Sequence, residues 1–264
     1  MPRFAANLSM MFNEVPFLDR FGAAAECGFK AVEFLFPYEH SPEAIADQLR
    51  KHNLQIVLFN MPPGNWAAGE RGVACIPGRE AEFRAGIETA LPYAKALCIP
   101  RLHAMAGIAP PDADRAECRA TLVANLKYAA GRLAEHEITV LLEAINFRDI
   151  PGFFVNTQAE SYAICTAAGE PNLKMQMDLY HMQIMEGDIA TKLRQYAPHC
   201  GHIQIAGAPG RNEPDTGEVR YEYLFRVLDE IGYPGWVGCE YRPAGKTIDG
   251  LGWLRSAERS TQSK

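Results

Sequence analysis

The segment LKMQMDLY, residues 173–180, alternates apolar and polar side chains and carries an aspartate, Asp178, close to its end. Alternation with a period of two residues is typical of a β-strand that has one face buried. Segments of the same kind recur along the chain, separated by turn residues and stretches of helical periodicity. Eight strands are expected, the other seven at residues 3–10, 31–36, 54–60, 101–107, 138–146, 201–207 and 236–242.

The stretches between the strands carry the start and stop signals of helices. In residues 41–53, Ser41 stands at the expected N-cap and a proline follows it at the first helical position. In residues 157–171, Thr157 and Glu160 have the spacing of a capping box. Further helices with an apolar face are expected at residues 114–137 and 221–235.

Strands that alternate with helices pair in parallel through right-handed crossovers. Eight such units in about 250 residues match the closed (β/α)8 TIM barrel, an α/β fold. A doubly wound open sheet is the alternative. That fold often carries a glycine-rich loop after its first strand, whereas NLSMMFNEV, residues 7–15, contains no glycine. Because no linker divides the chain, we expect residues 1–264 to form a single TIM-barrel domain.

Composition and charge argue against several classes of protein. The 264 residues are 48% hydrophobic and 22% charged, which is an ordinary globular composition. A net charge of −6 without a basic run argues against a nucleic acid or an anionic membrane as partner. The seven cysteines are scattered without a CxxC pair, which suits free thiols in a reducing compartment. With no apolar run of membrane-spanning length, we expect a cytoplasmic protein.

Four of the later strands end on residues with oxygen-bearing side chains. Because the ends of neighbouring barrel strands converge, these side chains are expected to meet in one small volume. Three carboxylates in a low dielectric repel one another, and a divalent cation is the simplest relief. An all-oxygen set favours Mg²⁺ or Mn²⁺, and positions left open for substrate favour catalysis. The expected metal ligands are Glu143, Asp178, Gln204 and Glu240.

At these residues the chain resembles the hydroxypyruvate isomerase family, which includes 2-oxo-tetronate isomerases and belongs to the xylose-isomerase-like barrels. The resemblance spans essentially the whole chain, and its most specific part is the third βα loop, FNMPPGNWAAGERGVACIPGRE, residues 59–80. The four strand-end residues match the metal positions of the family. Sugar epimerases of the same group place a histidine where this chain has Gln204. This difference fits the hydroxypyruvate branch and argues against a zinc-dependent DNA-repair barrel.

The resemblance implies a metal-dependent isomerisation of hydroxypyruvate to tartronate semialdehyde through an enediol. Moving a proton between adjacent carbons needs a base and an acid, and Glu143 and Glu240 are the expected pair. Three alternatives stay open: isomerisation of a four-carbon 2-oxo-tetronate, epimerisation of a free ketose at carbon 3, and a sugar-acid binding barrel without turnover. The intact set of four ligand positions argues against the last of these.

Five further residues are expected to contact the substrate. His181 follows Asp178 closely and is placed to bond a substrate oxygen. Arg211, in the loop after the seventh strand, is placed to grip a carboxylate through its planar guanidinium. His103 ends the fourth strand and either reaches the site or packs at the barrel mouth. The remaining two, both in the third βα loop, are Glu70 and Arg71.

Strand alternation also predicts a polar layer inside the barrel beneath the site. If Asp178 points inward, Gln176 and Lys174 do so too, and His202 belongs to the same layer. Such groups need hydrogen-bond partners, which the sequence does not identify. Glu33, in the second strand, either supports the metal ligands from behind or is structural, and the structural role is favoured.

The expected partners follow from the expected chemistry. The small-molecule partner is a 2-oxo hydroxy acid. The apolar and aromatic loop at residues 61–77 favours a homo-oligomer, either a dimer or a tetramer.

Overall fold

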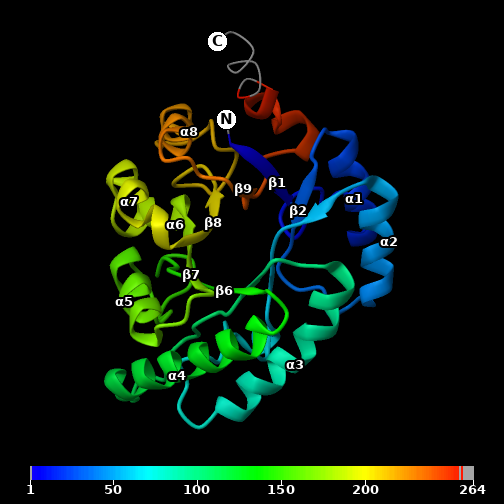
Figure 1. Cartoon of the computed structure of the whole chain (residues 1–264). Helices are drawn as coiled ribbons and strands as arrows, with labels where there is room; N and C mark the ends of the chain where they lie inside the picture. The colour runs from blue at the N-terminus through cyan, green and yellow to red at the C-terminus, as the bar shows by residue number, and fades with distance from the viewer. Residues whose placement is uncertain (1, 256, 258–264) are drawn as a thin grey trace.

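A computed structural model describes residues 2–255 and 257. Within them, nine parallel strands pair in the order β3-β2-β1-β9-β8-β7-β6-β5-β4. The helices form a ring around these strands (Figure 1). The strands are β1 Arg3–Asn7, β2 Ala31–Glu33, β3 Gln55–Ile56, β4 Phe59–Asn60, β5 Arg101–His103, β6 Thr139–Glu143, β7 Leu173–Asp178, β8 Cys200–Ile205 and β9 Trp236–Cys239.

The sheet closes into a barrel because its two end strands are consecutive parts of one extended segment. β3 pairs with β2, and β4, only two residues further on, pairs with β5. The backbone next to these strands continues to bond on both sides: between them the Val57 N–H donates to Val32 O at 2.9 Å, and just after β4 the Met61 N–H donates to His103 O at 2.9 Å. The run expected as the third strand is therefore this β3–β4 segment, and the (β/α)8 TIM barrel is confirmed.

The helices begin and end on the residues that local physics favours. Ser41 caps α2 by accepting from Ala44 N, and Thr157 and Glu160 form the expected capping box at the start of α5. No helix within residues 2–255 and 257 is long and apolar enough to cross a membrane. The α-helices are α1 Phe17–Glu26, α2 Pro42–His52, α3 Glu80–Leu97, α4 Arg115–Ala134, α5 Gln158–Ala168, α6 Leu179–Met185, α7 Ile189–Tyr196 and α8 Tyr221–Glu230.

Two separate apolar cores hold the barrel. The larger lies between the strands and the surrounding helices. The smaller consists mainly of small and medium side chains, among them Ala5, Ala31 and Leu141, each placed two residues before a polar residue that ends its strand. Because side chains of a strand alternate in direction, these apolar residues share the inner face with the polar groups above them. A small apolar layer therefore lies below the polar residues that end these strands.

Several strands are shorter than the sequence predicted. The largest change of type concerns residues 173–180, where β7 stops at Asp178 and α6 begins at Leu179, so the prediction that Tyr180 continues the strand is wrong. The physical reason is a cap: the Asp178 carboxylate accepts from Tyr180 N at 2.8 Å and starts the helix. His181 consequently lies in the first turn of α6 and is buried.

Candidate active site

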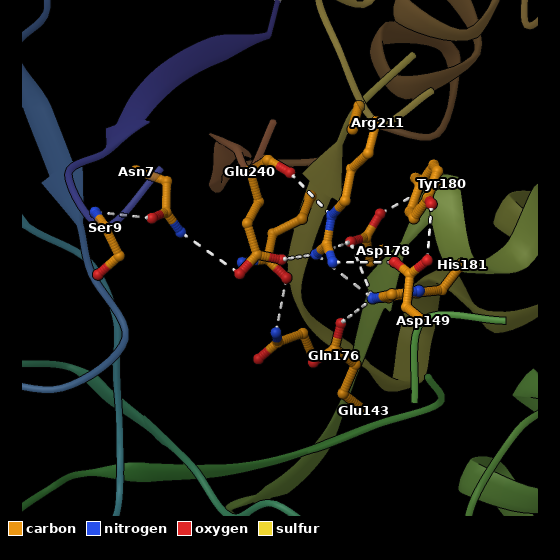
Figure 2. Close-up of polar contacts among 12 residues, drawn as sticks. Asn7, Ser9, Glu143, Asp149, Gln176, Asp178, Tyr180, His181, Arg211 and Glu240 are labelled. Atoms are coloured by element: carbon orange, nitrogen blue, oxygen red, sulfur yellow. Dashed lines mark hydrogen bonds and ion pairs between the residues drawn. The ribbon is translucent and has the colours of Figure 1, made fainter. Parts of the chain in front are cut away.

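Three buried carboxylates and a buried histidine meet at the carboxyl ends of β6, β7 and β9. Glu143, Asp178, His181 and Glu240 each offer one ligand atom, and these atoms all lie within 4.8 Å of one another. Their side chains point toward one another from different strand ends (Figure 2). The register places Asp178 of β7 directly beside Gln204 of β8, so four of the predicted residues reach the same end of the barrel.

The carboxylate oxygens at the centre of this cluster suit a divalent cation. One oxygen of Asp178 is used by the cap on α6, while its Oδ2 is buried without a hydrogen-bond partner among the described residues. Glu143 Oε1 is in the same condition. Buried carboxylate oxygens are costly unless they are paired or ligate a metal. The cluster can therefore hold a metal ion through hard oxygen ligands.

Burial changes the protonation of all three acids in the metal-free protein. Loss of water raises the pKa of Glu143 well above its ordinary value, and the nearby Glu240 and Asp178 add to the effect. Burial also raises the pKa of Asp178 to about 6 and that of Glu240 to about 8, although the Arg211 charge opposes both changes. Without a cation, the cluster holds protons near neutral pH.

We expect the affinity for a divalent cation to rise as pH increases from about 6 to about 8. Binding requires the carboxylates to lose their protons, so at pH 6 the cation must displace them, whereas above pH 8 it displaces fewer. Calorimetry in buffers of different ionisation enthalpy should record on the order of one proton released per ion at pH 6. An affinity that is constant across this interval would contradict the raised pKa values.

The same raised pKa values give a second readout with a defined sign. The folded, metal-free protein binds these protons more tightly than the unfolded chain, whose carboxyls have a pKa of about 4. The free energy of unfolding should therefore fall as pH rises from about 4 toward 8, and a saturating cation should remove this decline. Denaturant titrations at several pH values, with and without the cation, measure both effects.

The contacts of His181 determine which ring nitrogen carries its proton. Asn146 Oδ1 accepts from Asp149 N at 2.7 Å, so the Asn146 amide nitrogen faces His181 Nδ1, 2.5 Å away. Nδ1 is therefore an acceptor, and Nε2 carries the hydrogen. Arg211 Nη2 approaches Nε2 only at 3.5 Å, too far to reverse this assignment. Nε2 lies 3.6 Å from Asp178 Oδ2 and 3.7 Å from Glu143 Oε1, so in this tautomer its hydrogen is placed to donate toward the centre of the cluster.

Arg211 lies over the carboxylates and is held there from several sides. Its Nη2 donates to Glu240 Oε2 at 3.0 Å, and its Nη1 donates to Asp149 Oδ2 at 3.1 Å. The guanidinium also lies 5.1 Å from the Tyr180 ring centre, and Figure 2 shows it between Glu240 and Asp178. Burial alone would lower the pKa of Arg211, but Glu240 and Asp178 outweigh it and raise that pKa. Arg211 is thus a fixed positive charge at the site.

The polar layer beneath the site finds most of the hydrogen-bond partners that strand alternation requires, and Gln176 Oε1 and His202 Nδ1 are the atoms of this layer without one among the described residues. Gln176 Nε2 donates to Gln204 Oε1 at 2.6 Å, and Gln204 Nε2 donates to Glu33 Oε1 at 2.8 Å. His202 Nε2 lies 2.7 Å from Glu33 Oε2. The Gln204 carbonyl oxygen keeps a second lone pair, so its predicted role as a ligand is compatible with these bonds. Lys174, the lowest of these residues, is only partly buried.

Among the other predicted contacts, the structure brings His103 to the site. Its Nδ1 lies 3.7 Å from Glu143 Oε2, and burial, with a smaller effect of His202, lowers the pKa of His103 to about 3. Both ring nitrogens lack a hydrogen-bond partner within the part of the chain that the structure describes. His103 is therefore a neutral group beside Glu143, and its predicted contact with substrate stays a prediction.

Glu70 and Arg71 make their observed contacts inside their own loop. Glu70 bonds the Asn65 N–H and the Arg79 guanidinium. Arg71 lies 3.8 Å from the ring centre of Trp66 and donates to Trp66 O at 3.1 Å. In the described residues these contacts shape the loop, and the predicted role of Glu70 and Arg71 in substrate binding stays a prediction. The homo-oligomer expected from this loop also stays a prediction.

Four polar residues at the site escaped the sequence analysis. Asn7 donates to both Glu33 and Glu240, and Asn146 orients His181. Asp149 and Tyr180 hold Arg211, and the Tyr180 hydroxyl donates to Asp149 at 3.1 Å. A signal was present, because Asn146 and Asp149 follow the end of β6 within six residues and Asn7 ends β1. Polar residues in these positions line the mouth of a TIM barrel.

The fold and the site together define the class of protein. The family model of xylose isomerase-like TIM barrels matches residues 21–257, and the chain belongs to this family. The 2-oxo-tetronate isomerase of Cupriavidus necator is 58% identical over 255 residues, which cover 97% of this chain and 98% of that protein. The hydroxypyruvate isomerase of Escherichia coli K12 is 48% identical over 254 residues, covering 96% and 98%. The chain is therefore an isomerase, and the predicted resemblance is confirmed.

A solved structure shows how closely the backbone agrees with a relative. The crystal structure described as an AP endonuclease of family 2 from Brucella melitensis is 55% identical to this chain and superposes with a TM-score of 0.95. The match covers 97% of this chain and 99% of that one. The barrel and its loops are therefore shared over nearly the whole length.

Proposed function

We propose that the protein is a metal-dependent isomerase that interconverts hydroxypyruvate and tartronate semialdehyde through an enediol. The observation that carries this proposal is the placement of Arg211, whose guanidinium lies 3.0 Å from Glu240 within a buried cluster of acids. A fixed guanidinium charge beside two glutamates suits a small substrate that has a carboxylate next to its reacting carbons. The isomerases of Cupriavidus necator and Escherichia coli support the reaction class.

The two glutamates are the proposed acid and base. One carboxylate removes the proton from carbon 3 of hydroxypyruvate, and the pair of electrons left behind forms the carbon–carbon double bond of the enediol. The other carboxyl delivers a proton to carbon 2, while the proton on the carbon-3 hydroxyl moves to the carbon-2 oxygen. The carbonyl thereby moves from carbon 2 to carbon 3 with no change in composition. Glu143 and Glu240 offer ligand atoms within 4.8 Å of one another, a separation that suits an acid and a base acting on two adjacent carbons.

The proposed cofactor is Mg²⁺ or Mn²⁺, held by oxygen atoms of the strand ends. Glu143, Asp178, Gln204 and Glu240 would hold it, since two of their oxygens are buried without a partner among the described residues. When bound, the cation polarises the carbonyl and hydroxyl oxygens of the substrate and stabilises developing negative charge. Its positive charge would also lower the pKa that burial raises, which keeps the glutamates ionised. A carboxylate oxygen that does not bind the cation is then free to accept a proton.

Two further side chains are proposed to position the substrate. Arg211 uses only part of its N–H groups on Asp149 and Glu240, which leaves donors for the substrate carboxylate. His181 presents its Nε2–H toward the centre of the cluster and donates to a substrate oxygen. Because Asn146 fixes the imidazole and Asp149 fixes the guanidinium, both donors are oriented before the substrate arrives.

A four-carbon 2-oxo-tetronate is the second candidate substrate. The 58% identity with a 2-oxo-tetronate isomerase favours it. It presents the same carboxylate, carbon-2 carbonyl and carbon-3 hydroxyl as hydroxypyruvate, so the same residues would act on it. A free ketose lacks the carboxylate that Arg211 is placed to bind and is less favoured. The name of the Brucella structure suggests cleavage of DNA, but a net charge of −6 gives such a polyanion little attraction.

Removal of the metal should abolish turnover, and its return should restore it. We expect protein treated with a chelator to lose hydroxypyruvate isomerisation by at least about 10²-fold, because the enediolate charge then lacks its main stabilisation. Added Mg²⁺ or Mn²⁺ should recover the rate. The assay should include a 2-oxo-tetronate and, as the substrate without a carboxylate, D-fructose. Full activity in chelated protein with no bound metal would overturn the metal-dependent mechanism.

A further inference from the structure

Glu33 ends β2 and is fully buried inside the barrel, where its carboxylate receives three side chains. Asn7 Nδ2 donates to Oε1 at 3.0 Å, and Gln204 Nε2 donates to the same oxygen at 2.8 Å. His202 Nε2 bonds Oε2 at 2.7 Å. These partners come from β1 and β8, on either side of β9, so one carboxylate joins three parts of the inner wall.

The Glu33 carboxylate occupies space that a side chain at position 238 of β9 would fill, and this position is a glycine. A Cβ added to Gly238 would lie 2.4 Å from both Glu33 carboxylate oxygens, closer than real Cβ atoms come to any neighbour. Gly238 is also the register partner of Gln204, so the gap it leaves lies directly beside that side chain. A glycine in the interior of a strand usually marks a close approach of this kind. Glycine is therefore needed here for space.

The bond to Glu33 determines which end of the Gln204 amide faces the site. A side-chain amide has a donor end and an acceptor end, and only the NH₂ end can bond to a carboxylate. Glu33 therefore accepts from the Gln204 nitrogen. The Gln204 carbonyl oxygen accepts from Gln176 and keeps a lone pair for a cation. Asn7 is oriented in the same way: its nitrogen bonds Glu33 and reaches Glu240 at 3.5 Å, while its oxygen accepts from Ser9 N at 3.1 Å.

We propose that Glu33 is a positioning residue that presents the Gln204 carbonyl oxygen to the cation, with Gly238 providing the space it requires. The inference rests on the proposed metal site, and it adds that the site depends on a residue that does not touch the ion. An amide ligand can offer its nitrogen in place of its oxygen by rotating half a turn. A buried anion behind it removes that freedom. The carboxylate thus selects the ligand atom.

The test is Mn²⁺ affinity, measured by calorimetry on the metal-free full-length protein. Glu33→Gln keeps the shape of the side chain but removes its charge and one of its two acceptor oxygens, so the hydrogen bond that holds the Gln204 nitrogen becomes weaker. We expect Mn²⁺ to bind roughly 10- to 100-fold more weakly. Gly238→Ala removes no polar group, but its added methyl group should displace the Glu33 carboxylate and so weaken Mn²⁺ binding in the same direction. Glu186→Gln is the control, since Glu186 accepts from Gln158 N outside the site.

A double-mutant cycle with Gln204→Ala separates positioning from a general structural role. If Glu33 acts through Gln204, adding Glu33→Gln to Gln204→Ala causes little further loss of Mn²⁺ affinity. Equal affinity of the wild-type protein and both the Glu33→Gln and Gly238→Ala variants would overturn the inference, as would a fully additive loss in the cycle. If Glu33→Gln does not fold, Gly238→Ala decides by the same criterion. Failure of the wild-type protein to bind Mn²⁺ would instead overturn the proposed metal site and, with it, this inference.

Discussion

Replacing Glu143 or Glu240 with glutamine should lower kcat by roughly 10²- to 10⁴-fold while leaving the barrel folded. Glutamine has the shape of glutamate but cannot take a proton from carbon or return one. Each residue is almost completely buried, so the exchange changes charge rather than packing. The thermal midpoint of the metal-free variants should not fall, because burial already disfavours the charged form that glutamine removes.

Two measurements accompany the rate. Mn²⁺ titration shows whether a variant still binds the cation through its amide oxygen, which separates loss of the proton-transfer group from loss of the ion. The Glu186→Gln protein serves as the matched control for exchange of a glutamate away from the site. If both single variants keep wild-type turnover, the mechanism with two glutamates is wrong. If only one variant keeps wild-type turnover, the glutamate replaced in the other variant is the single essential acid–base group.

Arg211→Lys should reduce kcat/KM for hydroxypyruvate by roughly 10²- to 10³-fold, mainly through KM. Lysine keeps the positive charge but loses the planar fork that bonds Asp149 and Glu240 and leaves donors for the substrate carboxylate. The backbone of Arg211 has a φ of 58°, in the left-handed region, and arginine and lysine are equally strained there. The comparison therefore isolates the shape of the cation.

Asp149→Asn is the graded companion to this variant. It keeps Arg211 but weakens the ion pair that holds Nη1, so a smaller loss, roughly tenfold, is expected. Steady-state kinetics with hydroxypyruvate and with a 2-oxo-tetronate measure both effects. An unchanged KM in the Arg211→Lys and Arg211→Ala variants would show that this residue does not bind the carboxylate, and would remove the main argument for a 2-oxo acid over a free ketose.

Local sequence patterns predicted the parts of the protein whose physics is local. A period of two residues identified the inward-facing side of β7, and the spacing of Thr157 and Glu160 identified the start of α5. Strand ends placed Glu143 and Asp178 in one cluster, because parallel barrel strands all present their carboxyl ends at the same face. Each of these inferences needs only neighbours in the chain or the general geometry of the fold.

The end of β7 shows where local patterns compete. Alternation favoured a strand through residue 180, but Asp178 caps α6, which begins at Leu179. The cap is itself local, yet whether it outweighs alternation depends on room for the helix beside the barrel. Burial of His181 and its bond to Asn146 are consequences of that turn. The sequence therefore identified His181 as a site residue but did not predict that it lies in a helix.

Contacts between distant residues were decided by the tertiary structure alone. Arg211 and Asp149 are 62 positions apart, and His202 and Glu33 are 169 positions apart, so no periodicity relates them. The need for glycine at position 238 arises only because the Glu33 carboxylate crosses the barrel interior to reach it. By itself the sequence determined which chemical groups stand at the strand ends. Closure of the barrel decided which of them share a buried volume. Burial then decided their charge, and hydrogen bonds between distant residues decided tautomer and orientation, because these depend on distance in space rather than along the chain.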